Sequence, residues 1–223
     1  MAEKQDIPVQ IVLRPYASSI PLASLAFATG NTLYSALLLH WIPGSESRTV
    51  ALMLLAFVGP LELVPSLMAF LARDGGGATA FAIFGAAWIV QGLQLLSGQP
   101  ATHSAAVAVF LLCLALCLGM LAAVSFRGKP LLGATLCVAV VRTLLAAAGQ
   151  VSGAAWLPPA TAISGLVLAT LAFYIGLAFL QEDVSQTISP LTFRTGDARA
   201  AMDGPLEDQV AALHREAGVR KQL

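Results

Sequence analysis

VALMLLAFVGPLELVPSLMAFL, residues 50–71, contains a single charged residue, Glu62, near its middle. As a helix, this stretch is long enough to cross a hydrocarbon core about 30 Å thick. A charged side chain at that depth costs roughly 2.5–3.5 kcal/mol on insertion, so it usually faces a bundle interior or a watery path. Pro60 and Pro65 each remove a backbone donor, which predicts a kink or break in the helix. We therefore expect this segment to line a polar cavity.

Five further apolar segments have a similar length, and 57% of all residues are hydrophobic while only 11% are charged. This composition predicts an all-α, polytopic membrane protein rather than a soluble domain. The expected organisation is an N-terminal segment (1–19), a transmembrane domain (20–181) and a C-terminal tail (182–223), which contains an amphipathic helix at 205–217. The six predicted membrane helices are 20–42, 50–71, 78–96, 105–126, 131–151 and 160–180.

Basic residues are distributed unevenly between the two sides that these six helices define. Arg48 is the only basic residue on the side opposite the termini, while ten others, Lys129 among them, lie on the side of both termini. Because Lys and Arg are enriched in cytoplasmic loops, both termini are predicted to be cytoplasmic in a multi-pass cell (plasma or inner) membrane protein. Lipid and small solutes, not nucleic acid, are therefore the expected partners.

Arg142 is the other charge buried in an apolar segment. It lies about 15 Å from either end of the helix 131–151, too far for its side chain to reach water by extending along the helix. Because Glu62 has nearly the same depth, the simplest hypothesis is that the two residues form an ion pair. An anion bound by Arg142 is an equal alternative. Among the polar residues of the helix 20–42, Asn31 is the strongest candidate for a functional role.

Intramembrane enzymes are disfavoured because the predicted spans contain no Ser-His, paired-carboxylate or metal-ligand arrangement. The three cysteines, Cys113, Cys117 and Cys137, lie within predicted helices and are interpreted as packing residues. We expect neither a cofactor nor a metal.

Two stretches carry a family resemblance: GATAFAIFGAAW, residues 77–88, and PLASLAF, residues 21–27. The first is similar to the Gly-x-Thr-Ala-Phe-x-x-Tyr-Gly-x-Phe-Trp pattern that opens the third helix of the acetate uptake transporter family, the succinate-acetate permeases. The second resembles the family's Asn-Pro-Ala-Pro-Leu-Gly-Leu signature. The resemblance extends over about residues 14–192.

The resemblance implies a six-helix protomer, a cyclic homo-hexamer with one pore per protomer, and passage of acetate-like monocarboxylates or succinate, alone or with a proton. It also implies a constriction formed by Phe27, Phe84 and Ala139. Phe84 replaces the family's tyrosine, Glu62 replaces a glutamine, and Arg142 replaces an aliphatic residue. These departures change the chemistry of the pore more than its architecture.

The function predicted from these residues is a channel or proton-coupled transporter (symporter) for small organic acids. Phe27 and Phe84 would form an apolar gate, Asn31 would donate a hydrogen bond, and Arg142 would attract the carboxylate. Glu62 would pair with Arg142 when no solute is bound, or would accept a proton. Two alternatives remain open: a channel for urea or another small neutral solute, and a non-transporting membrane protein in which the charge pair only locks the bundle.

Overall fold

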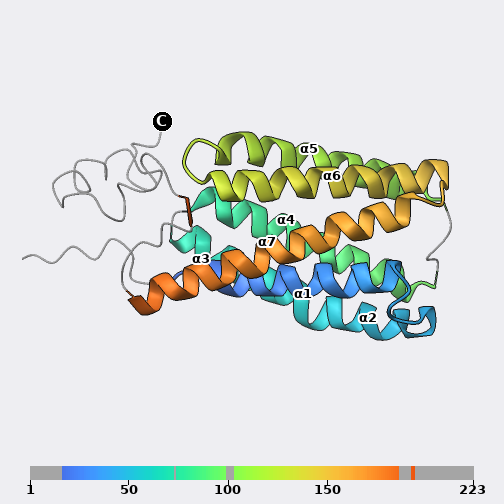
Figure 1. The fold of residues 1–223 in the computed structure, drawn as a ribbon, viewed down its shortest axis with the longest axis horizontal. Helices are drawn as coiled ribbons and strands as arrows, with labels where there is room; N and C mark the ends of the chain where they lie inside the picture. Colours follow the sequence, from blue (N-terminus) through green and yellow to red (C-terminus); the bar gives the residue numbers. More distant parts are fainter. Residues whose placement is uncertain (1–16, 73, 99–102, 186–191, 194–223) are drawn as a thin grey trace, which may run out of the picture.

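The computed structural model describes residues 17–72, 74–98, 103–185 and 192–193. Within these ranges every regular element is helical (Figure 1), which confirms the all-α expectation for this part of the chain. The 3-10 turn η1 (Gly44–Glu46) leads into α2, and the π-helical turn η2 (Leu54–Val58) joins α2 to α3. The α-helices are α1 (Ile20–Leu38), α2 (Ser47–Met53), α3 (Gly59–Leu71), α4 (Gly75–Leu96), α5 (Ala105–Ser125), α6 (Pro130–Ser152) and α7 (Leu157–Ser185).

Several helix ends follow directly from local sequence chemistry. The Asp74 carboxylate accepts a hydrogen bond from the Gly77 N–H at 3.1 Å at the start of α4, and the Ser104 hydroxyl accepts one from the Val107 N–H at 3.3 Å at the start of α5. Both are N-cap interactions that satisfy an otherwise unpaired backbone donor. Gly153 ends α6 at φ 61°, a left-handed conformation that favours glycine.

Among the described residues, five helical segments are long and apolar enough to cross a membrane: Gly44–Leu71, Gly75–Leu96, Ala105–Ser125, Pro130–Ser152 and Leu157–Glu182. They correspond to five of the six predicted spans. The remaining prediction, 20–42, corresponds to α1, which ends at Leu38 and is not among the five. Its polar residues, among them Asn31 and Ser35, lower its hydropathy, and both are fully buried. The structure thus does not confirm six membrane-spanning helices.

The expected helix break near Pro60 and Pro65 takes a different form. The segment from Ser47 to Leu71 is continuously helical, and it widens into the π-helical turn η2 just before Gly59 and Pro60. A π turn changes the local hydrogen-bond pattern without ending the helix, and such turns often occur at functional sites. Pro65 lies buried inside α3, which continues beyond it. Of the predicted kink or break, the structure excludes a break at the prolines, and the kink stays a prediction.

The helices run roughly along the long axis of the molecule and form a bundle (Figure 1). The closest neighbours are α1 with α7, α5 with α6, α3 with α4, and α6 with α7, whereas α4 and α5 touch only lightly. The start of α1 and the end of α7 lie at the same end of the bundle. The main cluster of buried apolar side chains comes from α1, α2, η2, α4, α5, α6 and α7 and includes Phe27, Trp88 and Leu168.

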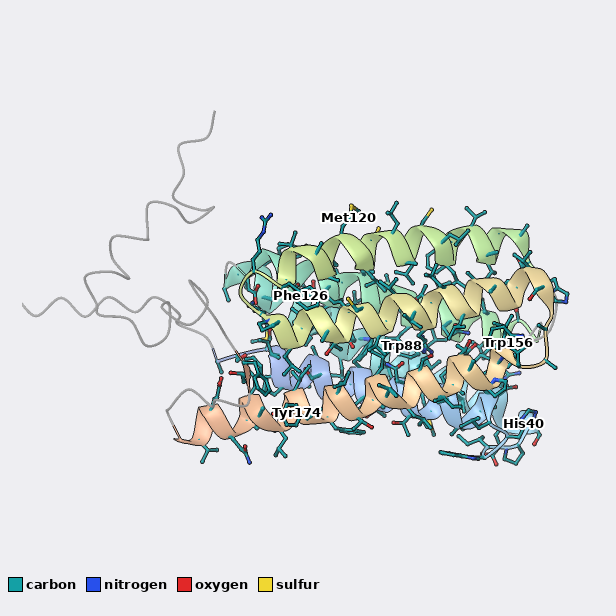
Figure 2. All side chains as sticks on the ribbon, turned by 45° about the horizontal axis from the view of Figure 1, so that its top comes forward. His40, Trp88, Met120, Phe126, Trp156 and Tyr174 are labelled. Carbon is teal, nitrogen blue, oxygen red and sulfur yellow. The ribbon has the colours of Figure 1, made fainter. Side chains whose placement is uncertain are left out.

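Large apolar side chains cover the outside of the bundle. Leu116 on α5 and Leu67 on α3 are 66% and 65% exposed, and Met120 points away from the bundle on α5 (Figure 2). Patches of this kind on so many helices are unusual in soluble monomers and suit contact with lipid or other membrane helices. The exterior therefore agrees with the composition in indicating a membrane protein.

Some predictions fall outside the described residues. These are the amphipathic helix at 205–217 and most of the N-terminal segment, residues 1–16.

Candidate functional site

Two aromatic rings meet near the middle of the bundle. Phe27 on α1 and Phe84 on α4 have ring centroids 4.5 Å apart, and Trp88, one turn beyond Phe84, lies 6.2 Å from Phe27 in an edge-on arrangement. Such tilted and edge-on pairs are favourable aromatic geometries. Phe27 and Phe84 each line two cavities, one on either side of their contact. The contact therefore separates the cavities.

The first cavity, called here the Arg142 cavity, has a volume of about 60 Å³. This volume accommodates several water molecules, since about 10–15 Å³ is needed for one. Its walls come from α1, α4, α5, α6 and α7 and combine aromatic rings with a few polar groups. The polar and aromatic lining residues are Phe27, Tyr34, Phe84, Trp88, Gln91, Gln94, Phe110, Arg142 and Thr143.

Arg142 provides the positive charge of this cavity. Its guanidinium carbon lies 5.5 Å from the ring centre of Tyr34 and 5.7 Å from that of Trp88, within the range of cation–π attraction. Its Nε atom is buried and has no hydrogen-bond partner in the described part of the chain. A cation held between two rings, and not neutralised by a carboxylate, can still attract an anion entering the cavity.

The second cavity, called here the Glu62 cavity, has a volume of about 70 Å³ and is more apolar. It lies between α1, α3, α4, α6 and α7. Asp74 and Lys129, from the loops before α4 and α6, also line it and form a salt bridge with Nζ 2.6 Å from Oδ2. Thr192, whose hydroxyl donates to Glu182 at 2.9 Å, contributes to the same wall.

The predicted ion pair between Glu62 and Arg142 is not formed, so that prediction is wrong for this structure. Glu62 is fully buried, and neither of its carboxyl oxygens has a hydrogen-bond partner among the residues that the structure describes. It lines the cavity on the far side of the Phe27–Phe84 contact from Arg142. Glu62 on α3 packs against Gly85 of α4, whereas Arg142 on α6 lies against the rings of α1 and α4. Similar depth places two residues at one level but does not turn them toward each other.

Only some of the remaining predicted site residues line one of the two cavities. Ala139 is buried and lines the Arg142 cavity next to the aromatic contact. Asn31 lines neither cavity. Its Nδ2 donates to the Phe27 carbonyl at 2.9 Å, while its Oδ1 is buried without a partner. Pro60 is exposed and Pro65 is buried, and neither lines the Arg142 cavity or the Glu62 cavity.

Sequence reasoning missed several residues of the site. Tyr34 and Trp88 frame Arg142, but a lone aromatic residue in an apolar helix gives no sign of which cation it meets. The Asp74–Lys129 pair joins loops far apart in sequence. The sequence contains one indication of this pair, an acidic and a basic residue in loops that are predicted to lie on the same side of the membrane.

The comparisons with known proteins agree with this architecture. The fold is similar to a solved structure described as the bacterial acetate channel SatP, with a TM-score of 0.69 and 17% sequence identity. The similarity covers 78% of this chain and 97% of that chain. At this identity the likeness establishes the fold alone. Among curated proteins, no sequence matches this chain.

The sequence matches the GPR1/FUN34/yaaH family over residues 5–194, which is most of the chain. Together with the structural likeness, the match confirms the family resemblance inferred from the GATAFAIFGAAW and PLASLAF stretches. This chain belongs to the GPR1/FUN34/yaaH family.

Proposed function

We propose that this chain forms a membrane channel or transporter for small organic anions of the acetate class. The observation that carries the proposal is the pair of cavities on the two sides of the Phe27–Phe84 contact, one of which presents an arginine without a carboxylate partner. Family membership and the likeness in fold to an acetate channel support the same kind of function.

The proposed path runs along the bundle from one cavity to the other. Phe27 and Phe84 act as an apolar gate, because rings 4.5 Å apart leave no open passage between them. Apolar constrictions commonly control permeation by excluding water and hydrated ions. Conduction requires these rings to move apart, while the small Ala139 side chain leaves room beside them.

Arg142 is the proposed binding group for the solute carboxylate. Arginine offers donors in a planar fork that matches a carboxylate, and charge-assisted bonds of this kind are among the strongest polar contacts in proteins. The aromatic walls would cover the apolar end of a short-chain acid, and the Gln91 amide would donate to its second oxygen. The proposal assigns Asn31 a supporting role beneath Phe27 rather than a direct contact with solute.

Glu62 gives the opposite half of the path a different character. A carboxyl group without partners repels a passing anion when ionised and can bond to it when protonated. The proposal therefore includes proton-dependent passage, in which Glu62 accepts a proton as the solute crosses. The proposed assembly and orientation follow the family resemblance: a hexamer with one path per protomer and both termini in the cytoplasm.

The test is uptake of labelled acetate, propionate and succinate into liposomes containing the purified protein, with and without a pH gradient. Labelled urea serves as the neutral solute. Replacing the cation by Arg142→Gln should raise the KM for acetate by about tenfold to a hundredfold, because a bond to a charged group contributes roughly 1.5–3 kcal/mol. Urea flux should not depend on this residue.

Arg48→Gln is the matched control, since Arg48 is exposed at the start of α2 and lines neither cavity. It should leave acetate uptake unchanged. Equal rates for acetate and urea, together with wild-type kinetics for Arg142→Gln, would support a neutral-solute channel instead. Liposomes that take up none of the solutes would favour the non-transporting alternative.

A further inference from the structure

Three buried polar atoms without hydrogen-bond partners lie on α1 and α6. They are Oδ1 of Asn31, Oγ of Ser35 and Nε of Arg142. Asn31 and Ser35 are both fully buried, and Asn31 precedes Ser35 by one turn on the same face of α1. Buried polar groups are nearly always bonded to protein or to ordered water, so a cluster of exceptions needs a physical explanation.

Gly165 on α7 brings two of these atoms together. A Cβ at this position would collide with the Ser35 hydroxyl and would lie 3.2 Å from Nε of Arg142. Both polar atoms therefore approach the same point on the α7 backbone, although they do not bond to each other. The glycine leaves room there for polar atoms of α1 and α6 to approach the α7 backbone.

The chemistry of the three atoms matches one kind of ligand. Arginine Nε is only a donor, the amide oxygen of Asn31 is only an acceptor, and the Ser35 hydroxyl is both. The assignment of Oδ1 follows from the bond that Nδ2 donates to the Phe27 carbonyl. An anion would be repelled by the amide oxygen, and a metal cation would be repelled by the guanidinium. Water can accept from Nε and donate to oxygen, and buried waters typically have two to four polar partners.

We propose that Asn31, Ser35 and Arg142 form a site for bound water beside Gly165, and that this water positions Arg142 for the solute. Arg142 connects the site to the Arg142 cavity, which Arg142 lines and which Asn31 and Ser35 do not line. Water held at Nε fixes the guanidinium from one side and leaves its terminal nitrogens for the carboxylate. The link to Arg142's role in binding rests on the proposed function, whereas the water site itself does not.

The first test is the thermal stability of purified Ser35→Ala. If the hydroxyl bonds to water, removing it breaks a buried hydrogen-bond network and lowers Tm. A hydroxyl that truly lacks a partner would instead cost stability, and its removal would raise Tm. Ser164→Ala is the control, because the Ser164 hydroxyl bonds only to the Thr161 carbonyl of its own helix, so Tm should stay near the wild-type value. A raised Tm for Ser35→Ala would overturn the water site.

The second test separates positioning from packing. Ser35→Ala should raise the KM for acetate by about threefold to tenfold with the maximal rate unchanged, as expected for loss of a positioned binding group. Gly165→Ala should have a similar effect by filling the site. Gly119→Ala is its control, since a Cβ at Gly119 meets open space.

The double variant Ser35→Ala with Gly165→Ala completes the design. It removes the hydroxyl with which the new methyl collides, while the Ser35 Cβ remains 3.7 Å from that methyl, an ordinary contact. The raised KM should persist, because the water site stays filled. Return to the wild-type KM would show that only packing matters and would overturn the positioning role. If the wild-type protein takes up no anion, the proposed function fails, while the Tm result still decides the water site.

Discussion

Replacing Glu62 by methionine should stabilise the protein while impairing transport. Glu62 is fully buried, and both of its carboxyl oxygens lack hydrogen-bond partners. A buried polar group left unsatisfied costs about 1–3 kcal/mol, whereas an apolar group of the same shape carries no such penalty. Methionine has a similar length and enough flexibility to fill the same space. The expected gain in the free energy of unfolding is therefore about 1–3 kcal/mol.

Thermal unfolding of the purified protein in detergent measures this gain. For a chain of this size, each kcal/mol shifts Tm by about 2–4 °C, so Glu62→Met should raise Tm by about 2–12 °C. Glu46→Met is the matched control, because Glu46 is exposed in the turn before α2, and surface changes are usually within about 0.5 kcal/mol. In the liposome assay, Glu62→Met should reduce the stimulation of acetate uptake by a pH gradient. A fall in Tm would refute the reasoning, since it would mean that the carboxyl group has a stabilising partner in the folded protein.

Three further substitutions test separate parts of the structure. Gly30→Ala places a methyl 3.0 Å from the ring of Trp88 and should destabilise the protein by about 1–3 kcal/mol, seen as a lower Tm. Lys129→Ala removes a salt bridge to Asp74, and the two side chains are 35% and 30% exposed. The substitution should therefore lower the free energy of unfolding by less than about 1 kcal/mol. A loss of stability that persists in high salt would contradict this. Phe84→Ala opens the aromatic contact and should increase uptake of propionate relative to acetate; an unchanged ratio would argue that the gate lies elsewhere.

The long helices were predictable because hydrophobic segment length is a strong and local signal. The segments 50–71, 78–96 and 105–126 have close counterparts in the structure. The segment 20–42 has a weaker hydrophobic signal, because α1 buries the polar residues Asn31 and Ser35 inside the bundle, and those residues reduce its apolar character. A helix surrounded by other helices needs less hydrophobicity than one facing lipid.

The candidate site was only partly predictable. Phe27 and Phe84 were identified through the family resemblance, and their ring centroids lie 4.5 Å apart in the structure. The predicted ion pair between Glu62 and Arg142 was wrong, because sequence gives the depth of a residue along a helix but not the direction in which its side chain points after packing. The rings of Tyr34 and Trp88 take the place that Glu62 was expected to fill.

The π-helical turn Leu54–Val58 determines which residues of α3 face the protein interior. A π turn contains about one residue more than the equivalent α-helical turn, and one residue corresponds to a rotation of about 100° around the helix axis. Deleting Ala56, an exposed residue of this turn, would therefore restore regular winding and swing the downstream half by that angle. Glu62 would leave its cavity for another face of the bundle. One surplus residue in this turn thus sets the orientation of the acidic group several residues away.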